Sequence, residues 1–353
     1  MSVIFAILLF SILIFVHELG HFMTAKLFGV QVNEFSMFMG PAIWKKQVGE
    51  TLYAVRTIPI GGYCAMEGED EDTDNPRSFQ KTAWWKRAII LVAGSAMNFL
   101  AGLLIYAILF LPSDQILVPE IHGFEDCCIF HSAEGLQVGD EILEIDGEKI
   151  LTNNDISMLL SLNPTGVHDL VVRRGDQILE FYDYAMTHTH TAQDGADYTH
   201  YGFSFGRAKD AGFPEKLSYI WKVAADNVRM VRLSLQMLVS GQVGLNDMAG
   251  PVGIVSQMSD IASEAPSAMD AFLNLLSVGG FIAINLAVMN LLPIPALDGG
   301  RVVCLLITTA VEAVTRKKID PKYEGYLHAA GMIALLGLMA VVMFKDIFVL
   351  FMR

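Results

Sequence analysis

The chain has 353 residues, of which 53% are hydrophobic and only 18% are charged. These values exclude a water-soluble domain of average composition and favour a membrane protein. The net charge of −14 excludes nucleic acid as a partner, because a phosphate-binding surface needs clustered lysine and arginine. The segment from Pro112 to Pro214 contains 18 of the 38 acidic residues but only 5 of the 24 basic ones, which predicts one acidic soluble domain within a nearly neutral membrane scaffold.

Four apolar stretches are long enough to cross a bilayer as helices. They cover residues 3–28, 88–111, 271–297 and 325–344, and the third continues past Asp298 towards residue 311. An even number of spans places both termini on the same side of the membrane.

Lysine and arginine in short connections predict the orientation. Eight basic residues lie between residues 26 and 87 and four between residues 316 and 322, whereas none precedes the first stretch. Both connections are therefore predicted to be cytosolic. The two termini and the acidic insert are predicted to be extracytoplasmic.

Residues 17–21 read His-Glu-Leu-Gly-His, an HExxH sequence, in the second half of the first apolar stretch. On a helix this spacing brings His17 and His21 to one face, where both imidazoles can bind one Zn²⁺. Glu18 then lies beside the metal, where its carboxylate can take a proton from metal-activated water. A chance match is the alternative, but these residues are costly in a membrane helix unless they serve a metal or a polar cavity.

A catalytic zinc site needs a third protein ligand and an open position. Asp298 is the one acidic residue between Asp270 and Glu312, and it lies in the sequence NLLPIPALDGG, whose prolines and glycines interrupt a helix. Irregular backbone at membrane depth is tolerated only beside protein or a wet cavity. A loop end with a common Asp-Gly turn is the alternative. Together with HExxH, the pattern favours Asp298 as the third ligand.

These motifs resemble those of the site-2-protease family of intramembrane zinc metalloproteases, in its bacterial branch with an inserted PDZ domain. The resemblance covers nearly the whole chain. The motifs that carry it, in the family order, are HELGH at 17–21, PIGGY at 59–63, GPVGI at 250–254 and NLLPIPALDGG at 290–300. The chain departs from the family pattern at Ser95, where relatives usually have proline, and it has one PDZ-like region where some relatives have two.

The resemblance implies an enzyme of the bacterial cytoplasmic membrane that cleaves transmembrane segments of single-pass membrane proteins. Pre-trimmed anti-sigma factors and signal-peptide remnants are substrates of the implied kind. The site residues that it implies are the zinc ligands His17, His21 and Asp298, the catalytic base Glu18, and the substrate-positioning residues Asn290 and Pro293.

β-Branched and aromatic residues between Thr51 and Met66 predict a hairpin-like pair of strands in the first cytosolic connection. A transmembrane substrate must be unwound before hydrolysis, and pairing it with an exposed strand edge would offset that cost. With the resemblance, Gly61 and Gly62 are the expected substrate-binding positions. Without it, an ordinary hairpin packed on the membrane surface is the preferred interpretation.

In the acidic insert, residues 135–147 alternate apolar and polar side chains before an Asp-Gly turn, residues 154–162 predict a short helix, and residues 168–181 predict two strands around a turn. This order resembles a PDZ domain, whose groove accepts a chain terminus or an extended peptide. A β-rich spacer without a ligand is the alternative. We expect the insert to exclude substrates with large external domains, and recruitment of substrate by its groove is the competing hypothesis.

The predicted fold is a multi-pass α-helical membrane protein with about four spans, a membrane-associated cytosolic β-hairpin loop and an inserted extracytoplasmic α+β domain. Its predicted parts are residues 1–111 with two spans, the PDZ-like residues 112–214, amphipathic surface helices in 215–270, and the last two spans in 271–353.

The predicted function is an intramembrane zinc endopeptidase. A catalytically silent PDZ scaffold with a structural metal site is the alternative, and Glu18 argues against it because a structural zinc site needs no base. A metal transporter would need further intramembrane ligands, and His328 is the candidate in the last apolar stretch.

Overall fold

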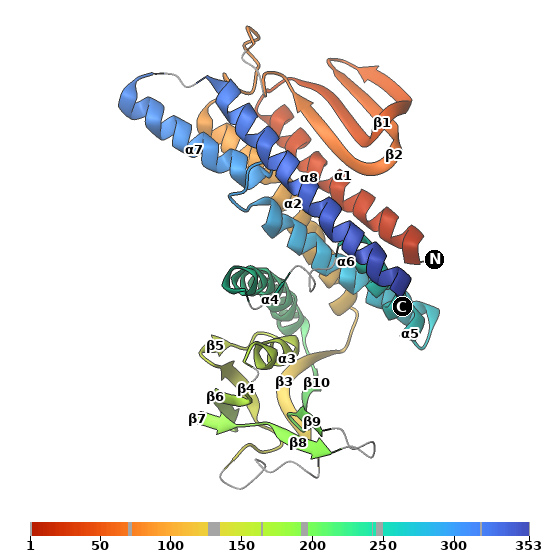
Figure 1. The fold of residues 1–353 in the computed structure, drawn as a ribbon, viewed down its shortest axis with the longest axis vertical. Helices are drawn as coiled ribbons and strands as arrows, with labels where there is room; N and C mark the ends of the chain where they lie inside the picture. Colours follow the sequence, from red (N-terminus) through yellow and green to blue (C-terminus); the bar gives the residue numbers. More distant parts are fainter. Residues whose placement is uncertain are drawn as a thin grey trace. The chain divides into compact units, whose positions relative to one another are not determined.

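The computed structural model describes residues 2–69, 73–125, 135–163, 165–191, 197–241, 243–244, 250–317 and 320–352. The chain forms two compact units, which we call the membrane unit (residues 1–106 and 230–353) and the inserted unit (residues 107–229) (Figure 1).

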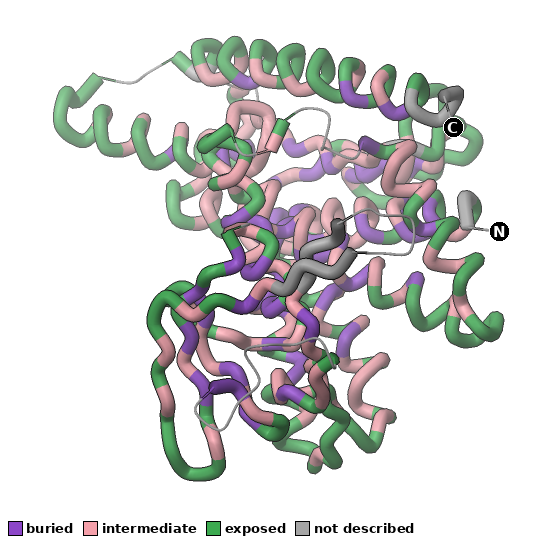
Figure 2. Tube along the Cα trace, turned by 60° about the horizontal axis from the view of Figure 1, so that its bottom comes forward, coloured by how far each residue is buried: buried purple, intermediate pink, exposed green. Residues whose placement is uncertain are grey.

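Among its described residues, the membrane unit contains four helices that are long and apolar enough to cross a bilayer, as the hydropathy of the sequence predicts. Their outward faces are apolar: in the last of them Ile333 is 72% exposed and Phe344 is 70% exposed. Figure 2 shows that this helix, which ends at the C-terminus, is exposed along much of its length. Apolar surface of this extent is stable when lipid covers it. The helices are α1 (Ser2–Leu27), α2 (Trp84–Phe110), α6 (Ala268–Asn290) and α8 (Pro321–Met352).

The third predicted span is shorter than its apolar stretch. Helix α6 ends at Asn290, residues 291–297 are not helical, and a new helix, α7 (Asp298–Thr315), begins at Asp298. The interruption that the prolines and glycines of this stretch predict is therefore present, because Pro293 and Pro295 lack the N–H groups that would continue the helix. Two further helices, α4 (Phe213–Ser240) and α5 (Pro251–Glu264), precede α6.

The connection between α1 and α2 forms an antiparallel sheet of two long strands, β1 (Val32–Val48) and β2 (Thr51–Met66). The predicted strand pair within residues 51–66 is wrong, because this whole segment is one strand and its partner is β1. Glu34 pairs with both Leu52 and Ala65, so the first half of β1 lies between the two ends of β2. The second end of β2, residues 62–66, is consequently an edge of the sheet.

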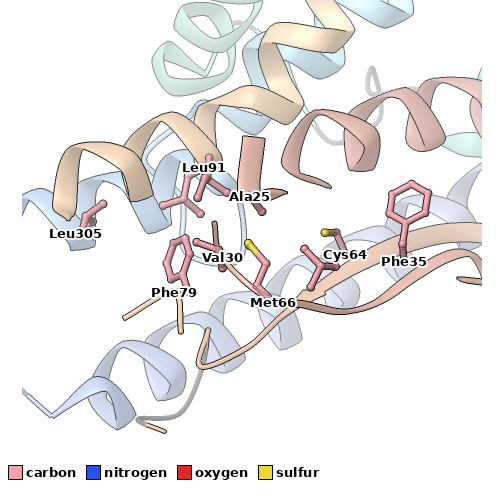
Figure 3. Packing of buried hydrophobic residues seen from close by; sticks show 10 residues of the cluster. Ala25, Val30, Phe35, Cys64, Met66, Phe79, Leu91 and Leu305 are labelled. Atoms are coloured by element: carbon pink, nitrogen blue, oxygen red, sulfur yellow. The ribbon is translucent and has the colours of Figure 1, made fainter. Parts of the chain in front are cut away.

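A cluster of buried apolar side chains fixes this sheet to the helices of the membrane unit. Figure 3 shows Ala25 at the end of α1 and Leu91 on α2, in the same buried cluster as Cys64 and Met66 on β2. Burial of such side chains contributes roughly 1.5–3 kcal/mol for each large residue. The cluster therefore holds the end of β2 against α1, the helix that carries the HExxH sequence.

The inserted unit contains one main antiparallel sheet with the strand order β10-β3-β4-β6-β7, and β5 pairs with β4. The predicted Asp-Gly turn joins β4 to β5, and both Asp146 (φ 51°) and Gly147 (φ 77°) have the left-handed backbone that such two-residue turns require. The elements are β3 (Gln115–Phe124), β4 (Glu141–Ile145), β5 (Glu148–Lys149), α3 (Asn153–Leu162), β6 (Val167–Arg174), β7 (Gln177–Ala185), β8 (His188–Thr191), β9 (Asp197–His200) and β10 (Phe203–Asp210).

Two buried carboxyl groups face each other where α3 meets the first half of α4. Thr152 Oγ1 donates to Asp226 Oδ2 at 3.0 Å, and Arg229 pairs with both Asp226 and Asp155. Burial, with the nearby Asp155 carboxylate, raises the pKa of Asp226 to about 7. Burial also opposes ionisation of Asp155, but hydrogen bonds from Asp226, Arg229 and two backbone N–H groups outweigh it and lower its pKa.

This pair predicts that the inserted unit loses stability as the pH rises from about 4 to about 7. The folded unit holds a proton at Asp226 that the unfolded chain, with an ordinary pKa of 3.8, has already released. The pKa of Asp155 shifts in the opposite direction, so this group changes the stability of the unit only at lower pH. Asp226→Asn should stabilise the unit at pH 8 by on the order of 1–3 kcal/mol and flatten its pH dependence. Unfolding midpoints measured from pH 5 to 8 test this, with the exposed Asp176→Asn as control.

Candidate active site

The two histidines of the HExxH sequence and Asp298 come together in the membrane unit. His17 and His21 lie one turn apart on α1, and their Nε2 atoms are 3.2 Å from each other. Asp298, the first residue of α7, places Oδ2 3.1 Å from His17 Nε2 and 3.3 Å from His21 Nε2. One ligand atom of each residue lies within 4.8 Å of those of the other two. Two distant parts of the sequence therefore contribute three metal-binding atoms to one compact set.

Two glycines let α1 and α2 approach closely enough to form this site. A Cβ atom at Gly94 of α2 would lie 2.4 Å from His21 Nε2, and one at Gly20 of α1 would lie 2.4 Å from the carbonyl oxygen of Ala93. Any larger residue at Gly94 would occupy the space in front of the imidazoles. The GxxxN sequence of α2, Gly94 to Asn98, thus forms one wall of the site.

The hydrogen bond of His21 decides which of its nitrogens faces the site. Its Nδ1 lies 2.8 Å from the carbonyl oxygen of Ile90. A carbonyl oxygen only accepts, so Nδ1 carries the proton, and in the neutral ring the lone pair is then on Nε2. Metal-binding histidines commonly have this partner on the other ring nitrogen. His21 is thus oriented and protonated as a metal ligand would be.

His17 has two asparagine side chains beside its other ring nitrogen. The amide groups of Asn98 and Asn290 lie 3.4 Å and 3.5 Å from His17 Nδ1. Asn98 is 1% exposed, and its oxygen has no hydrogen-bond partner when its nitrogen faces His17. The opposite amide orientation lets this oxygen accept from His17 Nδ1–H. In that orientation His17 Nε2 also directs a lone pair at the site.

The chemistry of these atoms fits a zinc ion. With both Nε2 atoms deprotonated, Asp298 Oδ2 is a buried oxygen without a hydrogen-bond donor, and three lone pairs converge on one point. Such an arrangement is unfavourable unless a cation occupies that point. Two histidines and one carboxylate are a ligand set of catalytic zinc sites, with a fourth position left open.

Glu18 lies between this group and the edge of the small sheet. It is close enough to His21, His17 and Asp298 to interact with their charges, and its carboxylate accepts a hydrogen bond from the backbone N–H of Cys64 on β2. A Cβ atom at Gly62 would lie 3.4 Å from Glu18 Cγ and 3.1 Å from the Ser36 carbonyl oxygen. The edge of β2 therefore passes directly beside the carboxylate.

The other predicted substrate-binding residues lie at different distances from this group. Asn290, the last residue of α6, reaches His17, whereas Pro293 lies in the loop before α7. Gly61 lies against the Met39 side chain, which would be 2.9 Å from a Cβ atom there. Sequence reasoning missed the contact of Asn98 with His17, although a lone asparagine in an apolar span was a signal for it.

The family model of the M50 peptidases matches residues 5–338, which includes both units and all three potential metal ligands. The chain belongs to peptidase family M50. This membership confirms the predicted resemblance to site-2 proteases and the prediction of a membrane metalloprotease.

Several curated relatives are similar to this M50 peptidase over almost their whole length. A protein of Clostridium perfringens, named as a proposed zinc metalloprotease, is 34% identical, with 98% of each chain covered. The zinc metalloprotease RasP of Bacillus licheniformis is 28% identical, with 99% of this chain and 100% of the relative covered. The regulator of sigma-W protease RasP of Bacillus subtilis is 26% identical, with 99% of each chain covered. These names agree with the predicted zinc cofactor.

Proposed function

We propose that this M50 peptidase hydrolyses peptide bonds within the transmembrane segments of single-pass membrane proteins. The observation that carries the proposal is the convergence of His17, His21 and Asp298 beside Glu18, on helices apolar enough to lie in a bilayer. In this proposal the first three residues are the zinc ligands and Glu18 is the catalytic base. The sigma-regulating relative supports substrates such as pre-trimmed anti-sigma factors, and signal-peptide remnants have the same single-pass form.

Zn²⁺ held by His17, His21 and Asp298 would supply Lewis acidity to the hydrolysis. The carboxylate of Glu18 takes the proton of the attacking water and passes it to the leaving amine. The N–H of Cys64 holds this carboxylate in place through its hydrogen bond. His21 keeps its orientation through Ile90, and His17 through Asn98.

The edge of β2 is where we place the substrate. Residues 62–66 pair with β1 on one side only, and Gly62 lies beside Glu18. An unwound substrate segment that pairs with this edge recovers part of the backbone hydrogen bonding lost from its helix. Gly61, Asn290 and Pro293 complete the proposed substrate-positioning set.

A direct test uses the purified, detergent-solubilised chain and a synthetic membrane-spanning peptide. We expect cleavage that a zinc chelator abolishes and added Zn²⁺ restores. A catalytically silent scaffold would bind such a peptide without cutting it. Absence of cleavage by protein that contains zinc, across several membrane-spanning peptides, would favour that alternative.

We propose that the inserted unit is a PDZ-like domain that restrains the protease on the extracytoplasmic side. Replacement of residues 112–214 by a short flexible linker should leave zinc content and cleavage of trimmed substrates nearly unchanged, because the segment contains none of the proposed ligands. Cleavage of substrates that keep large external domains should rise. If folded, zinc-loaded protein of this kind also stops cutting trimmed substrates, the groove recruits substrate instead.

We also propose that both termini and the inserted unit are extracytoplasmic, on the basis of the basic residues in the two short connections. Single cysteines at the exposed positions Lys81 and Asp176 test this in a background whose native cysteines are replaced by serine. In intact cells an impermeant thiol reagent should label Asp176→Cys and not Lys81→Cys, and both should react after lysis. The opposite pattern would reverse the orientation.

A further inference from the structure

Helix α8 contains none of the proposed zinc ligands, yet it contacts the loop that ends at Asp298. This loop, residues 291–297, connects α6 to α7 and has no regular secondary structure. The position of the Asp298 carboxylate depends on the path of these seven residues. Interactions that fix the loop therefore also fix one of the three ligand atoms.

The loop contains an unfavourable backbone conformation at Ala296. Its φ is +84°, in the left-handed region that residues with a Cβ atom rarely adopt. The N–H of Ala296 donates to His328 Nδ1 of α8 at 3.0 Å. His328 is 8% exposed, so this hydrogen bond forms largely away from solvent. This hydrogen bond offsets part of the conformational cost of Ala296, which lies two positions before Asp298.

The protonation of His328 follows from this contact. Nδ1 accepts a hydrogen bond from a backbone N–H, so the proton of the neutral ring is on Nε2. Nε2 faces the Glu324 carboxylate one turn earlier on α8, at 3.8 Å. The Glu324 carboxylate therefore favours the tautomer with its proton on Nε2, and in this tautomer Nδ1 can accept from the N–H of Ala296.

A second contact lies one turn further along α8. A Cβ atom at Gly331 would lie 2.5 Å from the carbonyl oxygen of Pro295 and 2.6 Å from its Cβ. Only glycine allows the helix to approach the loop this closely. By contrast, a Cβ atom at Gly337, on the same helix, would meet nothing within 4 Å.

The loop is enclosed from its other side by the start of α7. Cβ atoms at Gly299 and Gly300 would lie 2.2 Å from the carbonyl oxygens of Leu291 and Ile294. Pro295 and Ala296 are thus held between the first turn of α7 and the face of α8 that carries His328 and Gly331. This arrangement leaves the backbone before Asp298 little freedom.

We propose that His328 is a positioning residue for the metal site and acts through its hydrogen bond with Ala296. This bond and the close approach of α8 at Gly331 fix the position of the Asp298 carboxylate and thereby set the zinc affinity of the site. The inference rests on the zinc site proposed above. Residues that orient a metal ligand without touching the metal typically change affinity by about 10–100-fold when they are replaced. Loss of the His328 acceptor should therefore weaken zinc binding by about 10-fold or more.

The test compares matched variants of the full-length, detergent-solubilised protein by competition with a zinc chelator. His328→Leu removes the acceptor, whereas His328→Asn presents an amide oxygen near the position of Nδ1. We expect His328→Leu to lose about 10-fold or more in zinc affinity and His328→Asn to restore it to within a few-fold of the unchanged protein. Equal affinities in His328→Leu and the unchanged protein, or equal losses in His328→Leu and His328→Asn, would overturn the proposal.

A pair of glycine variants tests the second contact independently of the histidine. Both Gly331→Ala and Gly337→Ala replace a glycine of α8 with a better helix former, but only the first meets the loop. Gly331→Ala should weaken zinc binding, and Gly337→Ala should not change it. The same zinc affinity in both variants would show that the approach of α8 does not position the ligand.

Two further measurements separate a change at the metal site from a general loss of structure. The absorption spectrum of the Co²⁺-loaded protein reports ligand geometry, and we expect it to change in His328→Leu and Gly331→Ala but not in Gly337→Ala. Asp298→Ala serves as the reference for the proposed site. If Asp298→Ala binds zinc normally, the site itself is wrong; if it loses zinc while His328→Leu and Gly331→Ala keep it, only the role of α8 is wrong.

Discussion

Glu18→Gln is expected to abolish peptide cleavage while leaving about one zinc ion bound per chain. The amide has nearly the shape of the carboxylate and can still accept from the Cys64 N–H, but it cannot take a proton from water. Removal of a general base typically lowers the rate by about 10²–10⁴-fold. The proposed ligands are not altered, so the metal should remain.

Single-turnover cleavage of a membrane-spanning peptide and metal analysis of the same sample measure the two quantities together. Glu264→Gln, an exposed change of the same type on α5, is a suitable control and should retain full activity. Full activity in Glu18→Gln would remove Glu18 from the role of base. Loss of zinc together with activity would instead assign it to metal binding.

Replacing any one of the three proposed ligands is expected to remove zinc as well as activity, whereas Glu18→Gln removes activity alone. Asp298→Ala, His17→Ala and His21→Ala each leave two ligand atoms where a catalytic zinc site uses three. Affinity should fall by on the order of 100-fold or more, since even residues that only orient a ligand cost about 10–100-fold.

Zinc content after dialysis against a weak chelator measures this loss. His122→Ala and Asp260→Ala change the same residue types at exposed positions outside the proposed ligand set and should retain zinc. A normal zinc content in any of the three ligand variants would exclude that residue from the ligand set. Asp298→Ala is the most informative of them, because its assignment depends on the folded loop and not on a local helical spacing.

The sequence by itself determined the features that depend on local spacing or on bilayer thickness. The distance of four residues between His17 and His21 brings both rings to one face of any helix that contains them. Four stretches of sufficient length and hydropathy became four candidate spans, because a bilayer requires about 20 apolar residues per helix. The Asp-Gly pair at 146–147 predicted a tight turn because few other residues adopt two left-handed conformations in succession.

Only the tertiary structure decided which distant segments meet at the potential metal site. Asp298 was a candidate because it was an isolated acid, but its distance from His17 follows from how α7 packs on α1 and α2. The partner of β2 was misassigned because alternation within one strand carries no information about which strand lies beside it. The contact of Asn98 with His17 depends on Gly94, whose missing Cβ lets α2 come close to the imidazoles. Sequence periodicity predicts which face of a helix or strand is apolar, but not which other element packs against that face. The packing of these apolar faces against each other is what brings the polar groups of the site together.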